Sequence, residues 1–385
     1  MKQLKVAVVN TFDVKDIKNW SGIPFHISIM LESVFGKKNL NYVIISLKRS
    51  WFSYLKGFYF NRVRRKNYLS WADENLLLYN KKAFDVIEDG EFDLIITFQS
   101  FLIPNFKTKK SKVILWTDAT FKNLLNFYDY VSNLCNYTLN GGNALQKKAL
   151  QISNAIIFSS QWAINTAVQD YAADPQKVHL IPFSSNLNTS PSLEEINEII
   201  NHRSTGILKL LFLGVDWERK GGDMAVDVVN NLNKKGIKAI LYVVGTGAPI
   251  AYEGNKKIIS LGFINKNEAA GEKEIIKLLK DCSFLILPTK ADCTPVAFSE
   301  ANSYGLPVIT TNVGGIASVI INNLNGACFK SEIFVEDATT FIEKSWASLP
   351  GYRALCFTSY KYFNDELSWK IVEEKFKAVL SKIIF

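Results

Sequence analysis

The sequence has few residues of the kinds that hold metal ions or form disulfides. Its 385 residues include only three histidines, without the spacing of metal ligands, and five scattered cysteines, none of them in a C-x-x-C pair. Structural zinc sites need clustered Cys and His, and disulfide frameworks belong to small, cysteine-rich secreted domains. We therefore expect a reduced, intracellular chain without a structural metal.

Long hydrophobic runs are also missing. No stretch reaches the roughly 18 consecutive apolar residues that a membrane-spanning helix requires. The apolar run within the first ten residues is too short for the core of a signal peptide, and it predicts a strand instead. We expect a cytoplasmic protein, with peripheral attachment to the inner face of the membrane left open.

Negative charge is scarce in the first half of the chain. Residues 1–190 carry 23 Lys and Arg against 14 Asp and Glu, whereas residues 191–385 carry 22 of each, so the net charge of +9 lies entirely in the first half. Such a bias suits an anionic partner, for example a membrane surface, a lipid phosphate or a nucleic acid. A merely soluble basic surface would have the same composition.

One segment of that half, residues 48–71, combines cationic and aromatic side chains. It contains seven Lys and Arg, no Asp or Glu, and aromatic residues throughout. The combination suits an anionic membrane interface. It also suits stacking on single-stranded nucleic acid, which is the weaker alternative. In a third, purely structural interpretation, the aromatic residues lie in the core and the cations form a solvated face.

Short apolar segments alternate with helical stretches along the whole chain. The expected strands are Leu4–Val9, Tyr42–Ser46, Leu94–Phe98, Val113–Trp116, Ala155–Phe158, Val178–Pro182, Leu208–Leu213, Ala239–Val244, Lys257–Leu261, Phe284–Pro288, Pro307–Thr310 and Ala327–Phe329. Apolar strands separated by helices indicate parallel sheets that are covered on both faces. Because the chain is too long for one ordinary core, the predicted fold class is α/β with two Rossmann-like, doubly wound domains.

The expected domain boundaries follow a change in composition. Asn, Ser and Pro cluster around a short acidic helix expected at Ser192–Ile200. We place an N-terminal domain at residues 1–187, a linker at 188–206, a C-terminal domain at 207–363 and a last helix at 364–385, which we expect to return to the N-terminal domain.

The strongest chemical signal lies in residues 281–315. This stretch predicts a strand, a loop with Asp292, a helix that opens near Pro295 and contains Glu300, and a second strand. Helix N-termini attract phosphate through the helix dipole and through N–H groups that have no partner within the helix. A nearby acid suits sugar hydroxyls. A site that suits both phosphate and hydroxyls points to a sugar nucleotide.

A second signal follows the strand expected at Leu208–Leu213, which ends at Gly214. The next loop carries Arg219 and Lys220 ahead of a Gly-Gly turn and a helix. Two cations at the carboxyl end of a strand are well placed to neutralise a diphosphate leaving group. The alternative is a solvated basic turn.

Weaker signals lie at four other strand ends. Gly245 and Phe263 follow strands of the second half, where the backbone near them would meet a ligand or a nucleobase. Gly22 lies in the loop before a helix that opens at Pro24, and Asp118 directly follows another strand region. Asp118 would orient an acceptor hydroxyl or cap a helix. Ordinary turns and helix starts explain the glycines equally well.

The order of these motifs resembles that of the GT-B glycosyltransferases, specifically glycosyltransferase family 4. The resemblance covers nearly the whole chain and is carried by SSQWAINTAVQDYAADPQKVHLIPF, by YGLPVITTNVGG, and by Asp292 and Glu300, whose separation is similar to the family's E-x7-E motif. It implies two Rossmann-like domains facing each other across a cleft. It also implies a donor nucleotide sugar in the C-terminal domain, an acceptor in the N-terminal domain, retention at the anomeric carbon, and no metal or other cofactor.

The resemblance also implies roles for single residues. Glu300 would bind the ribose hydroxyls and Asp292 the transferred sugar. Lys220, with Arg219, would bind the diphosphate, and Asp118 would lie on the acceptor side. The other donor-site positions are Gly22 in an N-terminal glycine loop, Gly214, Gly245, Phe263, and the backbone N–H groups of Thr294, Val296 and Ala297.

Several positions depart from the family pattern. The first acid is Asp292 where the family usually has Glu, so its reach is shorter by about one C–C bond. Val215 stands where an arginine often follows the first glycine of this domain, and Pro295 lies in place of a glycine and has no N–H to donate. No histidine lies near Asp118, and Ser184 replaces a glycine.

We expect a retaining glycosyltransferase that moves a sugar from a nucleotide-sugar donor to a glycan or lipid-linked acceptor, in the synthesis of a cell-surface polysaccharide or glycoconjugate. One alternative is a catalytically inactive GT-B scaffold that binds nucleotide or membrane, and the missing arginine and glycines motivate it. Another is a GT-B sugar-nucleotide epimerase or a phosphorylase, which the scarcity of carboxylates and histidines and the lack of a pyridoxal phosphate motif disfavour. Nucleic-acid binding through residues 48–71 is a further alternative, and it predicts binding that weakens steeply with salt.

Overall fold

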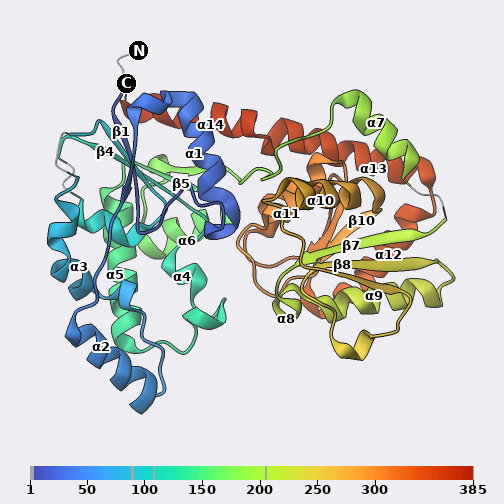
Figure 1. Cartoon of the computed structure of the whole chain (residues 1–385), viewed down its shortest axis with the longest axis horizontal. Helices are drawn as coiled ribbons and strands as arrows, with labels where there is room; N and C mark the ends of the chain where they lie inside the picture. Colours follow the sequence, from blue (N-terminus) through green and yellow to red (C-terminus); the bar gives the residue numbers. More distant parts are fainter. Residues whose placement is uncertain (1–3, 88–90, 107–108, 204–205, 385) are drawn as a thin grey trace. The chain divides into compact units, whose positions relative to one another are not determined.

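The computed structural model describes residues 4–87, 91–106, 109–203 and 206–384. The chain forms two compact units (Figure 1). The first comprises Met1–Ile181 and Glu373–Phe385, and the second comprises Pro182–Val372.

The first unit is built on a six-stranded parallel sheet. Its strands are β1 (Val6–Asn10), β2 (Leu40–Ile44), β3 (Leu94–Thr97), β4 (Lys112–Thr117), β5 (Ala155–Phe158) and β6 (Val178–Leu180), in the order β2-β1-β3-β4-β5-β6. β1, β3 and β5 are buried along their whole length. Strands buried on both faces are apolar throughout, which is why their sequences show no alternation.

Helices surround this sheet. They are α1 (Ile23–Phe35), α2 (Trp51–Phe58), α3 (Glu74–Tyr79), α4 (Phe121–Leu124), α5 (Asn136–Ile152) and α6 (Gln161–Tyr171). The last helix, α14 (Trp369–Ile384), ends in this unit as well, because Glu373–Phe385 belongs to it. There the buried Phe376 stacks on Trp116 of β4 with ring centroids 5.3 Å apart.

The second unit repeats the architecture. Its strands are β7 (Leu208–Gly214), β8 (Ala239–Gly245), β9 (Ile258–Gly262), β10 (Phe284–Leu287), β11 (Val308–Thr311) and β12 (Gly326–Phe329), in the order β12-β11-β10-β7-β8-β9, all parallel. The chain runs outward from β7 to β9, then returns to place β10 on the other side of β7. The topological switch point therefore lies between β7 and β10, which is where doubly wound sheets bind ligands.

Helices cover both faces of the second sheet (Figure 1). They are α7 (Leu193–His202), α8 (Trp217–Lys220), α9 (Gly222–Lys234), α10 (Ala269–Asp281), α11 (Val296–Ser303), α12 (Phe334–Trp346) and α13 (Leu349–Tyr362). α7 lies within the segment expected as a linker, and its Ile196 and Ile200 are buried in the core of this unit.

The predicted fold class is confirmed: α/β, with two parallel Rossmann-like sheets. Each of the twelve expected strands is present, with ends that differ by at most two residues. In the described ranges, no helix combines the length and the apolar character needed to cross a bilayer.

Candidate nucleotide-sugar site

The candidate site lies at the switch point of the second unit, where two loops follow adjacent parallel strands. β7 ends at Gly214 and leads to the one-turn helix α8, while β10 ends at Leu287 and leads through residues 288–295 to α11. β7 and β10 are paired in the sheet, so the residues beyond their carboxyl ends converge.

The convergence brings Lys220 of α8 to Asp292 of the β10 loop. The Lys220 Nζ forms an ion pair with Asp292 Oδ2, and the Arg219 Nη1 lies 3.7 Å from the same oxygen. The Lys220 and Asp292 side chains are each 13% exposed, so this pair is largely shielded from water. Three residues that the sequence predicts for the donor site thus lie together.

Both cations of the loop already have anionic partners. Arg219 Nε lies 3.2 Å from Asp216 Oδ2, and its Nη1 donates a 3.0 Å hydrogen bond to the Ala291 carbonyl. The two formal positive charges are thus matched by the carboxylates of Asp216 and Asp292. A diphosphate that entered here would compete with these carboxylates for the same donors.

Glu300 occupies the second turn of α11, and its side chain is only 3% exposed. Its carboxylate forms an ion pair with the Nζ of Lys266, a residue of the loop after β9. A carboxylate at this depth needs such a partner, because burial of an unpaired charge is costly. Lys266 is not among the residues that the sequence predicts for the site, because nothing in its local spacing marks a loop lysine that reaches a helix.

Two glycines make the close packing of these loops possible. At Gly221, between α8 and α9, φ is +75° and an added Cβ would lie 2.0 Å from the Pro288 carbonyl oxygen. At Gly245, φ is +106° and an added Cβ would lie 2.4 Å from the Gly214 carbonyl oxygen. Gly245 is therefore needed for the contact between the ends of β7 and β8, and this explains it without a ligand.

Pro295 is the N-cap residue of α11, and its side chain makes no hydrogen bond to the first turn. The Phe298 N–H donates to the Pro295 carbonyl at 3.1 Å, so this group is satisfied within the turn. Thr294 and Val296 are buried and Ala297 is half-buried. Backbone N–H groups at the start of a helix have no intrahelical acceptor, so Val296 and Ala297 are suitably placed for an anion.

Two further side chains near these strand ends are exposed. Phe263, which follows β9, is 70% exposed, and Val215, which follows β7, is 68% exposed. Phe263 is therefore available to stack on a planar group. Val215 adds no charge to the site, so in this loop the positive charge comes from Arg219 and Lys220.

Two predicted positions, Gly22 and Asp118, belong to the first unit. Gly22 is the N-cap of α1, and its φ of +82° follows two further left-handed residues, Trp20 and Ser21, with φ of 45° and 56°. Such backbone is unusual for residues other than glycine, and the sequence did not reveal it. Asp118 is half-buried after β4.

The alternative in which Asp118 caps a helix is wrong. The N-cap of α4 is Thr120, whose hydroxyl accepts from the Asn123 N–H while the Asn123 side chain accepts from the Thr120 N–H. Such a reciprocal capping box satisfies both donors, which leaves Asp118 outside the helix start.

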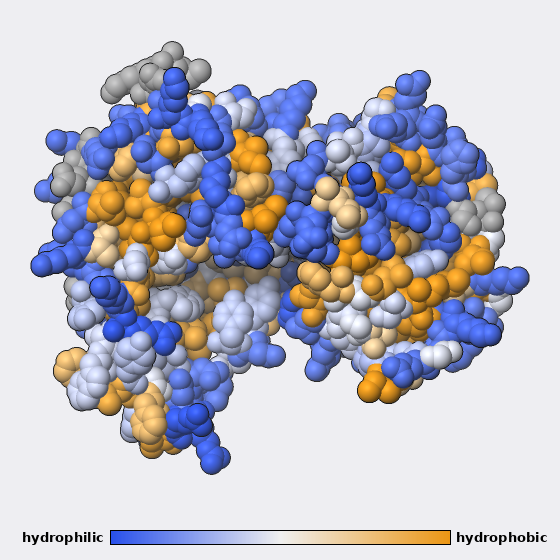
Figure 2. Space-filling model, viewed as in Figure 1, coloured by the Kyte–Doolittle hydropathy of each residue, from blue (hydrophilic) through white to orange (hydrophobic). Residues whose placement is uncertain are grey.

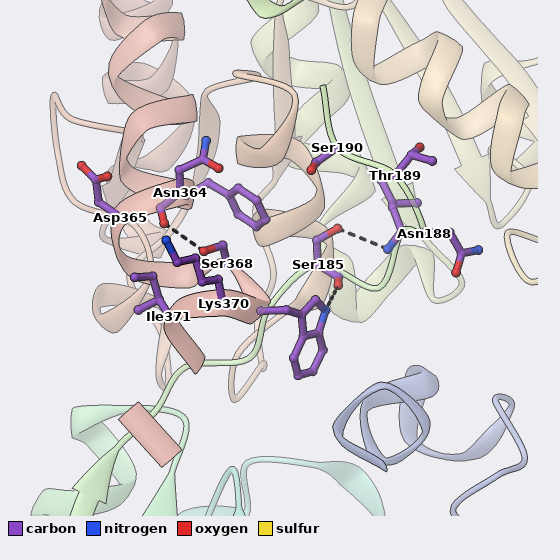
Figure 3. A pocket seen from close by; sticks show the side chains of 12 residues that line it. Ser185, Asn188, Thr189, Ser190, Asn364, Asp365, Ser368, Lys370 and Ile371 are labelled. Atoms are coloured by element: carbon purple, nitrogen blue, oxygen red, sulfur yellow. Dashed lines mark hydrogen bonds between the residues drawn. The ribbon is translucent and has the colours of Figure 1, made fainter. Parts of the chain in front are cut away.

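A separate hollow of about 660 Å³ lies elsewhere in the second unit (Figure 3). It is lined by residues of 185–190 and 363–371, among them Trp369, whose indole donates a 2.7 Å hydrogen bond to the Ser185 carbonyl. None of the predicted site residues lines it. Over the residues described, no group of three His, Cys, Asp or Glu is arranged to hold a metal ion.

Part of the chain matches a known family. Residues 194–345 match the family described as Glycosyl transferases group 1. This segment contains both loops of the candidate site.

Two curated relatives share parts of the sequence. An uncharacterized glycosyltransferase of Methanocaldococcus jannaschii is 27% identical over 119 residues, which are 30% of this chain and 32% of that protein. Lipopolysaccharide glucosyltransferase WaaG of Escherichia coli is 24% identical over 187 residues, which are 47% of this chain and 50% of that protein. The chain thus spans about a third and a half of the lengths of these two relatives.

The whole chain is similar to solved structures. HepE of Anabaena, solved in complex with UDP-glucose, superimposes with a TM-score of 0.63 over 98% of this chain and 100% of that one, at 11% identity. At this identity the likeness shows the fold alone. The chain therefore has the GT-B fold, and residues 194–345 carry a glycosyltransferase group 1 domain.

Proposed function

We propose that the protein is a retaining glycosyltransferase of family 4 that transfers a sugar from a nucleotide-sugar donor to a glycan or lipid-linked acceptor. The observation that carries the proposal is the meeting of Lys220 and Asp292 at the switch point of the second unit, next to α11 with its buried Glu300. This arrangement offers cations for a diphosphate and carboxylates for hydroxyls within one small region.

In the proposed reaction, the bond between the anomeric carbon and the diphosphate oxygen breaks. Lys220 and Arg219 stabilise the negative charge that develops on the leaving nucleoside diphosphate. The acceptor hydroxyl oxygen bonds to the anomeric carbon on the face that the diphosphate leaves, and its proton passes to a phosphate oxygen. Asp292 orients the sugar and Glu300 the ribose, so most of the catalysis is positioning and leaving-group stabilisation.

The relatives support a hexose donor and a surface glycan as product. One of them is described as a lipopolysaccharide glucosyltransferase, and a structural neighbour was solved with UDP-glucose. We therefore propose UDP-sugars as the first donors to test. A metal is not required in this scheme, because the cations of α8 would supply the charge that metals supply in other transferases.

The second candidate function is a GT-B scaffold that binds a nucleotide without turnover. It is favoured by the pairing of both site cations with carboxylates and by Val215 at a position where arginine is common. The two functions differ in turnover, not in binding.

The test begins with thermal shifts of the purified protein against UDP, GDP, ADP, CMP and dTDP, with and without magnesium. A ligand that binds only the folded state raises the unfolding temperature. Nucleotides that shift the transition are then offered as nucleotide sugars, and free sugar release is measured. A selective shift without metal plus slow release supports the transferase, whereas a shift without turnover of any matching donor supports the scaffold. No shift with any nucleotide would contradict both.

A further inference from the structure

The α2 helix and the turn that follows it present apolar side chains to solvent. We define the α2 patch as Trp51, Phe52, Tyr54, Leu55, Phe58, Tyr59 and Val63, whose exposed fractions run from 45% to 70%. Figure 2 shows apolar and weakly polar side chains gathered beside strongly hydrophilic ones at the lower left, where Figure 1 places α2. Single exposed apolar residues are ordinary, but a contiguous group marks a binding surface.

The patch is the apolar face of α2, which points to solvent. Trp51, Tyr54, Leu55 and Phe58 have the i, i+3, i+4, i+7 spacing of one helix face. In a core-facing helix this face would be buried, yet here it is the exposed one. Ser53 is the one buried residue of α2.

The inward face is held by polar contacts within the first unit. The Lys56 Nζ lies 3.0 Å from Asp73 Oδ2 and donates a 2.8 Å hydrogen bond to the Tyr137 hydroxyl. The Ser53 hydroxyl lies 3.3 Å from the Tyr68 hydroxyl, which in turn donates to Asp73 at 2.6 Å. Because Asp73 is almost fully buried, these contacts fix the orientation of α2 and keep its apolar face outward.

Exposed cations flank the patch along the chain. Lys48 and Arg49 precede α2, and Arg62, Arg64, Arg65 and Lys66 follow it; all six are exposed. No Asp or Glu occurs in residues 48–72. The Nζ of Lys66 donates to the Asn133 side chain, which is a neutral partner.

We propose that the α2 patch and its cations dock the protein on an anionic phospholipid membrane. The apolar side chains insert among the headgroups while the Lys and Arg side chains contact lipid phosphates. The proposal extends the proposed function by giving a surface for contact with a membrane that would carry a lipid-linked acceptor. It rests on the first unit alone and not on the donor site of the second.

Two other occupants fit less well. A second copy docked through the same patch would place like charges against each other, which disfavours a symmetric contact. Single-stranded nucleic acid stacks its bases on aromatic rings, but Leu55 and Val63 have no aromatic face to offer. A membrane interface accommodates aliphatic and aromatic residues together.

The test is sedimentation of the full chain with vesicles of phosphatidylcholine alone and of phosphatidylcholine mixed with phosphatidylglycerol. We expect binding to the anionic vesicles only, weakening as salt rises, because salt screens the charges. Combined substitution of Trp51→Gln, Phe52→Gln and Phe58→Gln should reduce the vesicle affinity by about tenfold for each side chain that inserts. Combined substitution of Arg62→Gln, Arg64→Gln and Arg65→Gln should reduce it by about fivefold per charge.

Matched variants control for exposure and charge. Two substitutions remove exposed large side chains at other places: Tyr130→Gln, at a residue that is 60% exposed, and Ile250→Gln, at one that is 82% exposed. Lys37→Gln, Lys38→Gln and Lys109→Gln remove three exposed cations of the same unit. The control variants should bind anionic vesicles like the wild type, and all variants should keep the wild-type unfolding temperature and nucleotide affinity.

Several results would overturn the proposal. The first is that the wild type does not bind anionic vesicles, and the second is that the patch variants bind as tightly as the controls. The third is that the patch instead drives self-association or binding of a single-stranded oligonucleotide. Because nucleotide affinity is measured on the same variants, failure of membrane docking and failure of the proposed function are distinguished.

Discussion

At the scale of single residues, Glu300 is the side chain on which the donor site depends most. It is nearly fully buried and paired with Lys266, so its carboxylate is held in one place before any ligand arrives. A preorganised acceptor of this kind suits the hydroxyl pair of a ribose, because little side-chain entropy is lost on binding.

Replacing Glu300 should therefore weaken nucleotide binding. We predict that Glu300→Ala lowers the affinity for the preferred nucleotide by about 1–3 kcal/mol, the usual contribution of hydrogen bonds to a charged group. Titration calorimetry with the ribonucleotide and with its 2′,3′-dideoxy analogue measures it, and the dideoxy analogue should lose far less. Glu332→Ala, at an exposed acid of the same unit, is the control. Equal affinities of wild type and Glu300→Ala would remove Glu300 from the site.

The sequence predicted some of these residues for reasons that can be stated. Asp292 and Lys220 were each expected in the donor site, from the motifs after two strands and the family that these motifs resemble. The structure brings them together because β7 and β10 are neighbours and their carboxyl ends converge. Lys266 was missed because its contact with Glu300 depends on how the loop after β9 folds over α11. A cap at Asp118 was one of two alternatives, and the cap is Thr120, since the spacing of Asp and Thr in TDAT does not show which residue begins the helix.

At the scale of elements, the junction of α8 and α9 depends on a glycine. Gly221→Ala should cost more than the strain of a left-handed residue, because its Cβ would meet the Pro288 carbonyl. Gly236→Ala is the matched control, with a φ of +85° and open space around the added atom. We predict that Gly236→Ala lowers the free energy of unfolding by about 1–2 kcal/mol and that Gly221→Ala lowers it by at least about 2 kcal/mol more. Urea unfolding of both variants measures the difference, and equal losses would contradict the predicted packing.

The orientation of α2 depends on Asp73. Burial opposes ionisation of this carboxyl, but hydrogen bonds from Tyr68, Lys56 and Tyr137 outweigh it and lower its pKa. A carboxyl with a lowered folded-state pKa adds stability above its unfolded value of about 3.9, and this stability is lost as the pH falls through the folded value. Asp73→Asn should thus be less stable than wild type near neutral pH, with a difference that shrinks in acid. Urea midpoints at about pH 7 and pH 3 test this, and a difference independent of pH would contradict it.

Sequence patterns predicted the elements well but not which surfaces they leave exposed. The strands were found because runs of Val, Ile, Leu and Phe between helices are local signals. The outward face of α2 was not predictable in the same way, because apolar spacing defines a helix face without saying what covers it. The interpretation that the aromatic residues of this segment fill the core is wrong for those of α2, which are exposed, whereas Tyr68 is buried.

At the scale of the whole molecule, the two halves of the sequence differ in charge, whereas the two units share one architecture. The basic excess lies in the first half of the sequence, whereas the candidate donor site lies in the second unit. Both sheets have a switch point, so the same topology offers two ligand-binding regions. We propose that one serves the acceptor and the other the donor.

Residues Glu373–Phe385, most of α14, belong to the first unit, where Phe376 is buried. Phe376→Ala should destabilise the first unit by about 3–5 kcal/mol, because it removes a fully buried ring that stacks on Trp116. Lys377→Ala, at the next and exposed position, should cost little. Urea unfolding followed by circular dichroism measures both variants. A loss for Phe376→Ala no larger than for Lys377→Ala would show that α14 does not stabilise the first unit.

The central claim is tested most directly by proton NMR of a nucleotide sugar that is incubated with the protein. UDP-glucose is the first donor, and an acceptor is added once one has been identified. We predict release of the nucleoside diphosphate with the anomeric configuration of the donor kept in the first-formed product, and a rate about 10²–10³-fold lower for Lys220→Ala. Inversion would contradict the retaining mechanism. Catalysis at this site would be contradicted if a nucleotide binds but every matching donor stays intact, and if the wild type and Lys220→Ala show the same rate.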